Sequence, residues 1–258
     1  MLELIRYQYC RVVAKHKSKT THPESIELDL FSLISNKPKI KVAIIDDQPF
    51  PYTNALEAEG CTVKVFDDYS LKIKQRNQKI KIIDFSSFDV IVCDVHEVGK
   101  LIFPGSEGIS VIEDLRKKYP LKVIAAYTGD PGAILTKLKK QDTLDKTFAK
   151  EWGVDDFLFN FRQITEIFNK PKERWEFIQR RLTHLGLPQH KTIGLQHAFV
   201  EHILFCQMLS TRPNYDEIQF KKLATTMSNN IDFVAVTRVG LKVAEVAQLF
   251  IPFAELIK

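Results

Sequence analysis

Acidic, hydroxyl and basic side chains recur at the ends of four apolar segments in this sequence. They are Asp46 and Asp47 after residues 42–45, Asp94 at the end of residues 88–94, Thr128 at the end of residues 123–128, and Lys150 at the end of residues 147–150. Carboxylates placed together repel one another, so such a cluster is costly unless a divalent cation lies among them. Three carboxylates, a hydroxyl and an ammonium together describe a site that accepts a phosphoryl group.

The segments that carry these side chains have the composition of buried strands. They are short, apolar and rich in β-branched residues, as expected for strands of a parallel sheet that is covered on both faces. The clearest helical pattern, Ser106–Tyr119, keeps its apolar residues on one stripe and ends before Pro120. Alternating strands and helices of this length predict a doubly wound α/β fold, in which ligand sites lie at the carboxyl ends of the strands.

Further elements are predicted between the first strand and the Asp94 strand. Residues 52–59 suit a short helix, which Gly60 would end, since glycine is favoured just past helix ends. Residues 61–66 read as a second strand. A polar helix is then predicted to lead to Ile82 and Ile83.

The order of these polar residues resembles that in the receiver domain of bacterial two-component response regulators. The residues that carry the resemblance are Asp46, Asp47, Asp94, Thr128 and Lys150. Two further matches support the resemblance. Gly129 is the small residue that the family usually has after the hydroxyl, and residues 104–108 resemble the P-x-x-x-G turn that follows its phosphorylated aspartate. The resemblance covers roughly residues 39–168. It implies a flavodoxin-like fold with a five-stranded parallel sheet.

The sequence departs from this family beside the site. The stretch between Asp94 and Pro104 is longer than the usual loop. Glu151 follows Lys150 where the family usually has a proline in a cis bond, and Thr147 stands where its strand usually carries an aromatic residue. The acceptor residues are retained. However, we do not expect phosphorylation to be signalled through the rotation of an aromatic ring at position 147.

Phosphoryl transfer in line needs a nucleophile, a metal ion that neutralises charge, and donors for the equatorial oxygens. The resemblance makes Asp94 the nucleophile that attacks a phosphohistidine, and Mg²⁺ the metal ion. Thr128 and Lys150 would bind phosphoryl oxygens. The expected magnesium ligands are Asp47, Asp94 and the backbone carbonyl of His96, with Asp46 acting directly or through water.

The segments on either side of residues 39–168 lack this alternation of strands and helices. Residues 1–38 are predicted to form an N-terminal extension, in which Leu4–Val13 suits either a strand or a short helix. Residues 169–258 are predicted to form an all-α C-terminal module that acts in output or interaction. Its predicted helices cover residues 171–185, 190–209 and 215–257.

Composition narrows the class of protein. The 258 residues carry a formal net charge of +5, which permits an acidic partner but does not demand nucleic acid. The 4 cysteines are scattered, which suits a reducing compartment. The N-terminal segment lacks the pattern of a signal peptide, because its apolar residues are interrupted by Arg6, Arg11 and Lys15. No apolar stretch of the sequence approaches the length needed to span a membrane. A cytoplasmic protein without membrane contact is expected.

These observations predict a response regulator in a magnesium-dependent phosphorelay: a phosphoacceptor with self-catalysed phosphorylation and dephosphorylation, not an enzyme. Its expected partners are a sensor histidine kinase or phosphotransfer protein, and a protein partner of the helical module, with a homodimer as a further option. Two alternatives stay open. One is a receiver-like scaffold that works without phosphorylation, and the other is a receiver that controls an effector enzyme or a nucleic-acid binder.

Overall fold

The computed structural model describes residues 2–26, 40–71, 80–139, 141–168 and 170–210. The chain divides into two compact units, residues 39–165 and residues 1–38 together with residues 166–258, and each is described by itself. The predicted helix over residues 215–257 lies outside the described residues.

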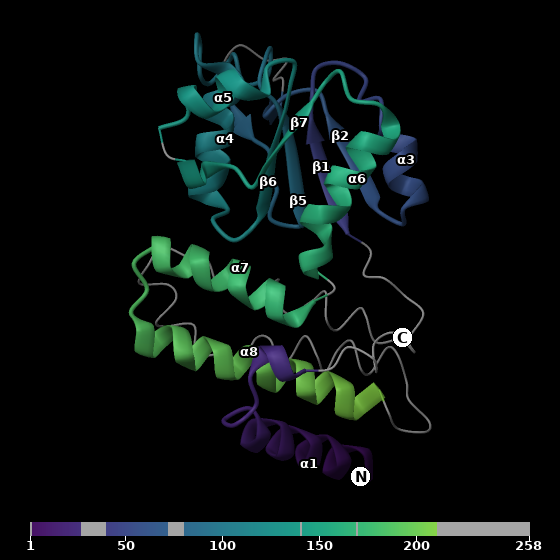
Figure 1. Ribbon diagram of the computed structural model, residues 1–258, viewed down its shortest axis with the longest axis vertical. Helices are drawn as coiled ribbons and strands as arrows, with labels where there is room; N and C mark the ends of the chain where they lie inside the picture. The colour runs from purple at the N-terminus through teal and green to yellow at the C-terminus, as the bar shows by residue number, and fades with distance from the viewer. Residues whose placement is uncertain (1, 27–39, 72–79, 140, 169, 211–258) are drawn as a thin grey trace. The chain divides into compact units, whose positions relative to one another are not determined.

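A parallel sheet of five strands, in the order β2-β1-β5-β6-β7, forms the centre of the unit 39–165 (Figure 1). The strands are β1 (Lys41–Ile45), β2 (Thr62–Phe66), β5 (Val90–Asp94), β6 (Val123–Thr128) and β7 (Lys146–Ala149). The residues of β5 and β6 are buried throughout, as expected for central strands with helices on both faces. This strand order is the flavodoxin-like one, so the predicted doubly wound fold is confirmed.

Helices cover both faces of this sheet. They are α3 (Thr53–Ala58), α4 (Glu107–Lys118), α5 (Pro131–Lys137) and α6 (Val154–Thr165), with a single 3-10 turn, η2 (Gln141–Thr143). Figure 1 shows α3 and α6 on one side of the sheet and α4 and α5 on the other. In α4, Val111, Ile112 and Leu115 are buried in the main core, as the predicted apolar stripe requires.

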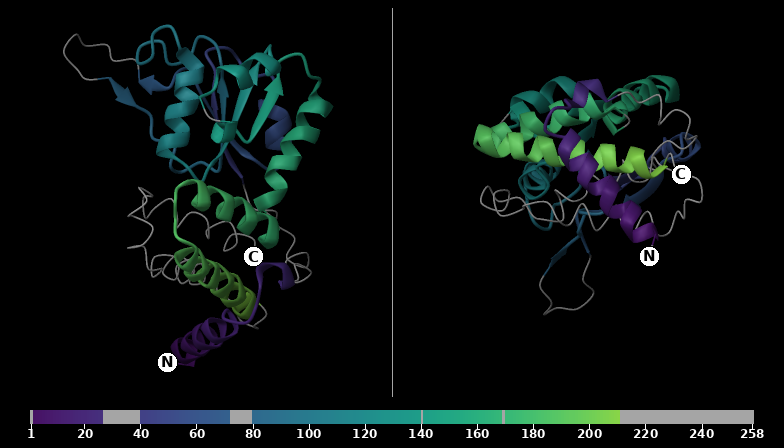
Figure 2. Two further views of the ribbon diagram at one scale, coloured as in Figure 1. Left: turned by 60° about the vertical axis from the view of Figure 1, so that its left-hand side comes forward. Right: turned by 90° about the horizontal axis from the view of Figure 1, so that it is seen from below.

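A two-stranded hairpin stands where a polar helix was expected between β2 and β5. Its strands, β3 (Ser70–Leu71) and β4 (Lys81–Ile82), are antiparallel and project from the rest of the unit (Figure 2). The helix prediction is therefore wrong for residues 67–71 and 80–81, while residues 72–79 lie outside the described part. The physical reason is aromatic packing, because the buried rings of Tyr69 and Phe85 beside the strands stack at 5.9 Å. Such burial overrides local helix propensity.

The described part of the other unit is helical. It contains α1 (Leu2–Lys17), η1 (Pro23–Ser25), η3 (Glu166–Phe168), α7 (Pro171–His184) and α8 (Gln189–Ser210). Leu4–Val13 is thus helical, and α1 packs on α8 through an edge-to-face contact of Tyr7 with Phe205 at 5.4 Å (Figure 2). Trp175 and Phe199 join α7 to α8. No helix among the described residues is both long and apolar enough to cross a membrane.

Gly108, in the first turn of α4, makes a close contact with the strand that ends in Asp94. A Cβ atom at this position would lie 2.2 Å from the carbonyl oxygen of Asp94 and 2.6 Å from that of Val95. Gly108→Ala should therefore destabilise the unit by about 1–3 kcal/mol, the usual cost of over-packing. Chemical denaturation would measure this change.

Gly132→Ala in α5 is the matched control. Its added methyl group would meet only the Asp130 side chain, at 3.6 Å, so the variant should gain up to about 1 kcal/mol from helix propensity. A Gly108→Ala variant as stable as the wild type would show that α4 does not hold the backbone of Asp94.

Candidate phosphoacceptor site

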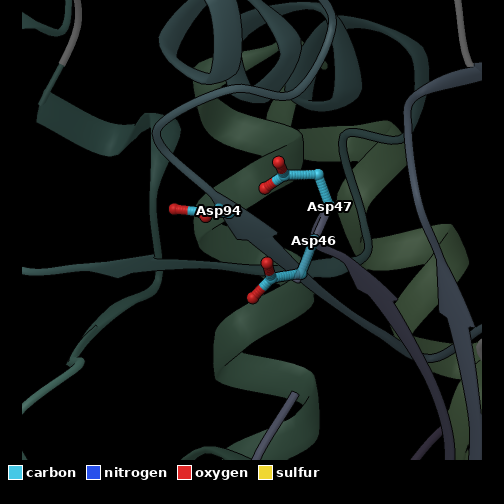
Figure 3. A group of neighbouring side chains, drawn as sticks. All are labelled: Asp46, Asp47 and Asp94. Carbon is cyan, nitrogen blue, oxygen red and sulfur yellow. The ribbon is translucent and has the colours of Figure 1, made fainter. Parts of the chain in front are cut away.

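Three carboxylates meet at the carboxyl ends of β1 and β5. The two strands are parallel neighbours, and Ile45 pairs with Cys93 in their register, so the residues that follow reach the same level of the sheet. One oxygen from each of the side chains lies within 4.8 Å of the others: Asp46, Asp47 and Asp94 (Figure 3). Asp46 and Asp94 are buried, whereas Asp47 is exposed. The predicted acidic cluster is thus assembled by the sheet.

The predicted ammonium and hydroxyl lie at the next two strand ends. Lys150 follows β7, and its Nζ donates to Asp94 Oδ2 at 2.7 Å. The Lys150 backbone N–H donates to the Thr128 carbonyl at 2.9 Å, which ties the ends of β6 and β7 together. Thr128 is buried, and its hydroxyl oxygen accepts the N–H of Asp130 at 3.2 Å. The structure therefore joins Lys150 directly to Asp94 and places Thr128 at the same sheet edge.

His96 contributes its backbone to the site. Its N–H donates to Asp94 Oδ1 at 3.2 Å, while its side chain is exposed. Each oxygen of Asp94 thus has a donor, His96 N–H on Oδ1 and Lys150 on Oδ2. The role of the His96 carbonyl as a metal ligand stays a prediction.

The cluster carries an excess of negative charge. The pKa of Asp46 is raised to about 6, chiefly because burial removes water from its carboxyl group. A hydrogen bond from the Gln48 N–H and the charge of Lys150 lower it, and the charges of Asp94 and Asp47 raise it. A set of hard oxygen ligands with surplus negative charge fits Mg²⁺, which prefers one or two carboxylates together with waters. The residues present therefore suit the metal ion that the sequence pattern predicts.

The long loop after Asp94 packs against the core and is hydrogen-bonded to it. Val95 and Val98 are buried, and the buried carboxylate of Asp68 accepts the N–H of Gly99 at 2.6 Å. Glu97 has φ of 66°, an uncommon conformation for a residue other than glycine. Sequence reasoning missed Asp68, although the pair Asp67-Asp68 follows strand β2 as the pair Asp46-Asp47 follows β1. That pattern could have identified it.

Aromatic residues beside Lys150 were also missed. The Tyr52 hydroxyl donates to the Trp152 carbonyl in the turn that follows β7, and the rings of Tyr52 and Phe157 stack at 4.1 Å. Every described peptide bond is trans, so this turn, with Glu151 in place of the family's proline, uses no cis bond. The residues that shape it come from distant parts of the chain.

The pKa of Asp46 predicts a pH effect on stability. The folded state keeps the proton up to about pH 6, whereas the unfolded chain releases it near the ordinary aspartate pKa of 3.8. The folded state binds more protons in that window, so stability should fall as the pH rises through it. Asp46→Asn should therefore stabilise the protein at pH 8 by roughly 1–3 kcal/mol, with little effect at pH 4.

Urea denaturation of both proteins across this pH range measures the difference. Carbon NMR of the Asp46 carboxyl group provides the control on the mechanism. If that carboxyl titrates near pH 4 in the folded protein, burial and the neighbouring carboxylates do not raise its pKa, and the expected pH effect is wrong.

Comparison with known proteins finds similarity to solved structures only. No protein-family model matches the sequence, and no curated protein matches it. The chain is similar to the signal receiver domain of an HD domain-containing protein from Pseudomonas fluorescens Pf-5, at 16% identity over 51% of this chain and 90% of that chain, with a TM-score of 0.37. Chemotaxis response regulator CheY4 of Vibrio cholerae matches at 18% identity over 48% and 98%, with a TM-score of 0.36.

The beryllofluoride-activated NtrC4 receiver domain dimer matches at 20% identity over 49% of this chain and 96% of that chain, with a TM-score of 0.36. All of these structures are receiver domains, and they leave about half of this chain without a counterpart. The flavodoxin-like fold of residues 39–165 rests on the strand order and parallel pairing of its own sheet.

Proposed function

We propose that this chain is a response regulator that accepts a phosphoryl group on Asp94 in a magnesium-dependent phosphorelay. The observation that carries the proposal is the contact of Asp94 with Lys150 at 2.7 Å beside two further carboxylates. A purely structural ion pair would not need Asp46 and Asp47 nearby, because their charges make the cluster less stable. A site that binds a cation and then an anionic phosphoryl group does need them.

Each residue has a role in the transfer. A carboxylate oxygen of Asp94 attacks phosphorus, and the P–N bond of a phosphohistidine breaks with its electron pair going to the imidazole nitrogen. Lys150 then leaves the Asp94 carboxylate for a phosphoryl oxygen, and Thr128 donates its hydroxyl to another. Asp46, Asp47, Asp94 and the His96 carbonyl would hold Mg²⁺, which neutralises charge on the transferring group. The donor would be a sensor histidine kinase or a phosphotransfer protein.

The helical unit is proposed as the output of the signal, through protein contacts. Its helix α1 buries Tyr7, Cys10 and Ala14 against α8. On its other side α1 exposes Ile5 and Tyr9, at 61% and 60%, and Val12 at 65%. An exposed apolar stripe of this kind suits a protein partner or a second copy. No comparable feature of the described residues favours nucleic acid.

Phosphorylation of Asp94 is the direct test of the proposal. Incubation with acetyl phosphate and Mg²⁺ should add the mass of one phosphoryl group to the intact protein, and removal of Mg²⁺ by a chelator should prevent this. Asp94→Asn should abolish the addition, because an amide is not a nucleophile toward phosphorus.

Asp89→Asn is the matched control. Asp89 precedes the same strand, and its carboxylate accepts the Lys41 N–H at 2.9 Å. Its variant should be phosphorylated like the wild type. The assignment fails if Asp94→Asn is labelled equally, and a wild type that takes up no phosphoryl group would favour the scaffold alternative.

If the helical unit is the output, activation at Asp94 should change the dynamics of its helices. Beryllofluoride with Mg²⁺ mimics the phosphoryl group and should alter hydrogen exchange in α1, α7 or α8, since a signal requires different affinities of the two states. Asp94→Asn should show no such change. If exchange changes only within residues 39–165, the proposed output through the helical unit is wrong.

A further inference from the structure

The ammonium group of Lys150 has a second neighbour besides Asp94. Its Nζ lies 5.2 Å from the centre of the Tyr127 ring, within the range of a cation–π interaction. Tyr127 pairs with Asp94 in the register of β5 and β6, so both side chains leave the sheet on the same face. A carboxylate and an aromatic ring from neighbouring strands thus hold the same ammonium group.

Tyr127 itself is held firmly. Its side chain is buried, and Phe50 meets its ring nearly edge-on at 5.1 Å. Its hydroxyl is hydrogen-bonded to the hydroxyl of Tyr52. Burial raises the pKa of both phenols, so both stay neutral at physiological pH. The ring therefore offers Lys150 a fixed surface.

Tyr52 holds the backbone that follows Lys150. Its hydroxyl donates to the carbonyl of Trp152, two residues after the lysine. Its ring stacks on Phe157 in α6, with an angle of 8° between the planes. This contact links the turn after β7 to the beginning of α6. The position of Lys150 thus depends on two tyrosines, one under the ammonium and one on the turn.

We propose that Tyr127 and Tyr52 are positioning residues for Lys150, which they hold ready to receive a phosphoryl oxygen. The proposal rests on the proposed phosphoacceptor function. The Lys150 side chain is 35% exposed. Without a further contact, it would therefore spend part of its time in rotamers that point into solvent and do not contact Asp94. An additional carboxylate would hold the ammonium too, but it would compete with the incoming phosphoryl group. A neutral ring attracts the ammonium without such competition.

Site-resolved chemical labelling of Lys150 tests this without any phosphoryl group. Brief acetylation at pH 8, followed by mass spectrometry, compares Lys150 with Lys139, whose side chain is 82% exposed. Tyr127→Leu should raise the relative labelling of Lys150 by about threefold to tenfold, the ratio expected for a lost cation–π contact. Tyr127→Phe keeps the ring and should stay within about twofold of the wild type.

Two more variants define the mechanism. Tyr52→Phe should speed hydrogen exchange between residues 151 and 154, because it removes the bond to the Trp152 carbonyl. Tyr119→Leu removes another buried phenol, one whose hydroxyl donates to Asp84, and serves as the matched control for general loosening. It should leave the labelling of Lys150 unchanged.

The outcomes separate this proposal from the proposed function. With acetyl phosphate and Mg²⁺, Tyr127→Leu should be phosphorylated about threefold to tenfold more slowly, and Tyr127→Phe near the wild-type rate. Equal labelling of Lys150 in Tyr127→Leu and Tyr127→Phe, or an equal rise in Tyr119→Leu, would overturn the positioning role. A wild type that shows the expected labelling but accepts no phosphoryl group would overturn the phosphoacceptor function and leave the positioning role standing.

Discussion

Repulsion between two buried carboxylates is the constraint on which the site depends. Asp46 and Asp94 end neighbouring parallel strands, so the sheet holds their charges within 4.8 Å of each other, and the pKa of Asp46 rises to about 6 as a result of burial and this repulsion. Lys150 supplies one compensating charge at 2.7 Å. The rest of the negative charge favours a divalent cation, whose binding would relieve the repulsion among the carboxylates.

The surrounding structure buries and holds Asp94, whereas the side chain of Lys150 is 35% exposed. Gly108 lets α4 contact the backbone of Asp94, and Asp68 holds the loop beyond it through the Gly99 N–H. Lys150, in contrast, is held by one ion pair and by the face of the Tyr127 ring. A fixed nucleophile with a movable cation is what the proposed transfer requires, since the ammonium must follow the phosphoryl group from one oxygen to another.

The sequence predicts the sheet and its charged strand ends because both signals are local. Buried parallel strands are continuous apolar runs, and the polar residue that ends each run is visible without any knowledge of the fold. The β3–β4 hairpin was not predicted, since the stacking of Tyr69 on Phe85 joins residues far apart in sequence. Tyr52 and Tyr127 were missed for the same reason, as their contact also depends on tertiary packing.

The central claim, that Asp94 accepts the phosphoryl group, is tested most directly by locating the acyl phosphate. Borohydride reduces an acyl phosphate to an alcohol, so a phosphorylated aspartate becomes homoserine, which peptide mass spectrometry identifies by position. After treatment with acetyl phosphate and Mg²⁺, we expect homoserine at position 94, and none without Mg²⁺. Homoserine at position 46 or 47, or at none of the three aspartates, would contradict the account.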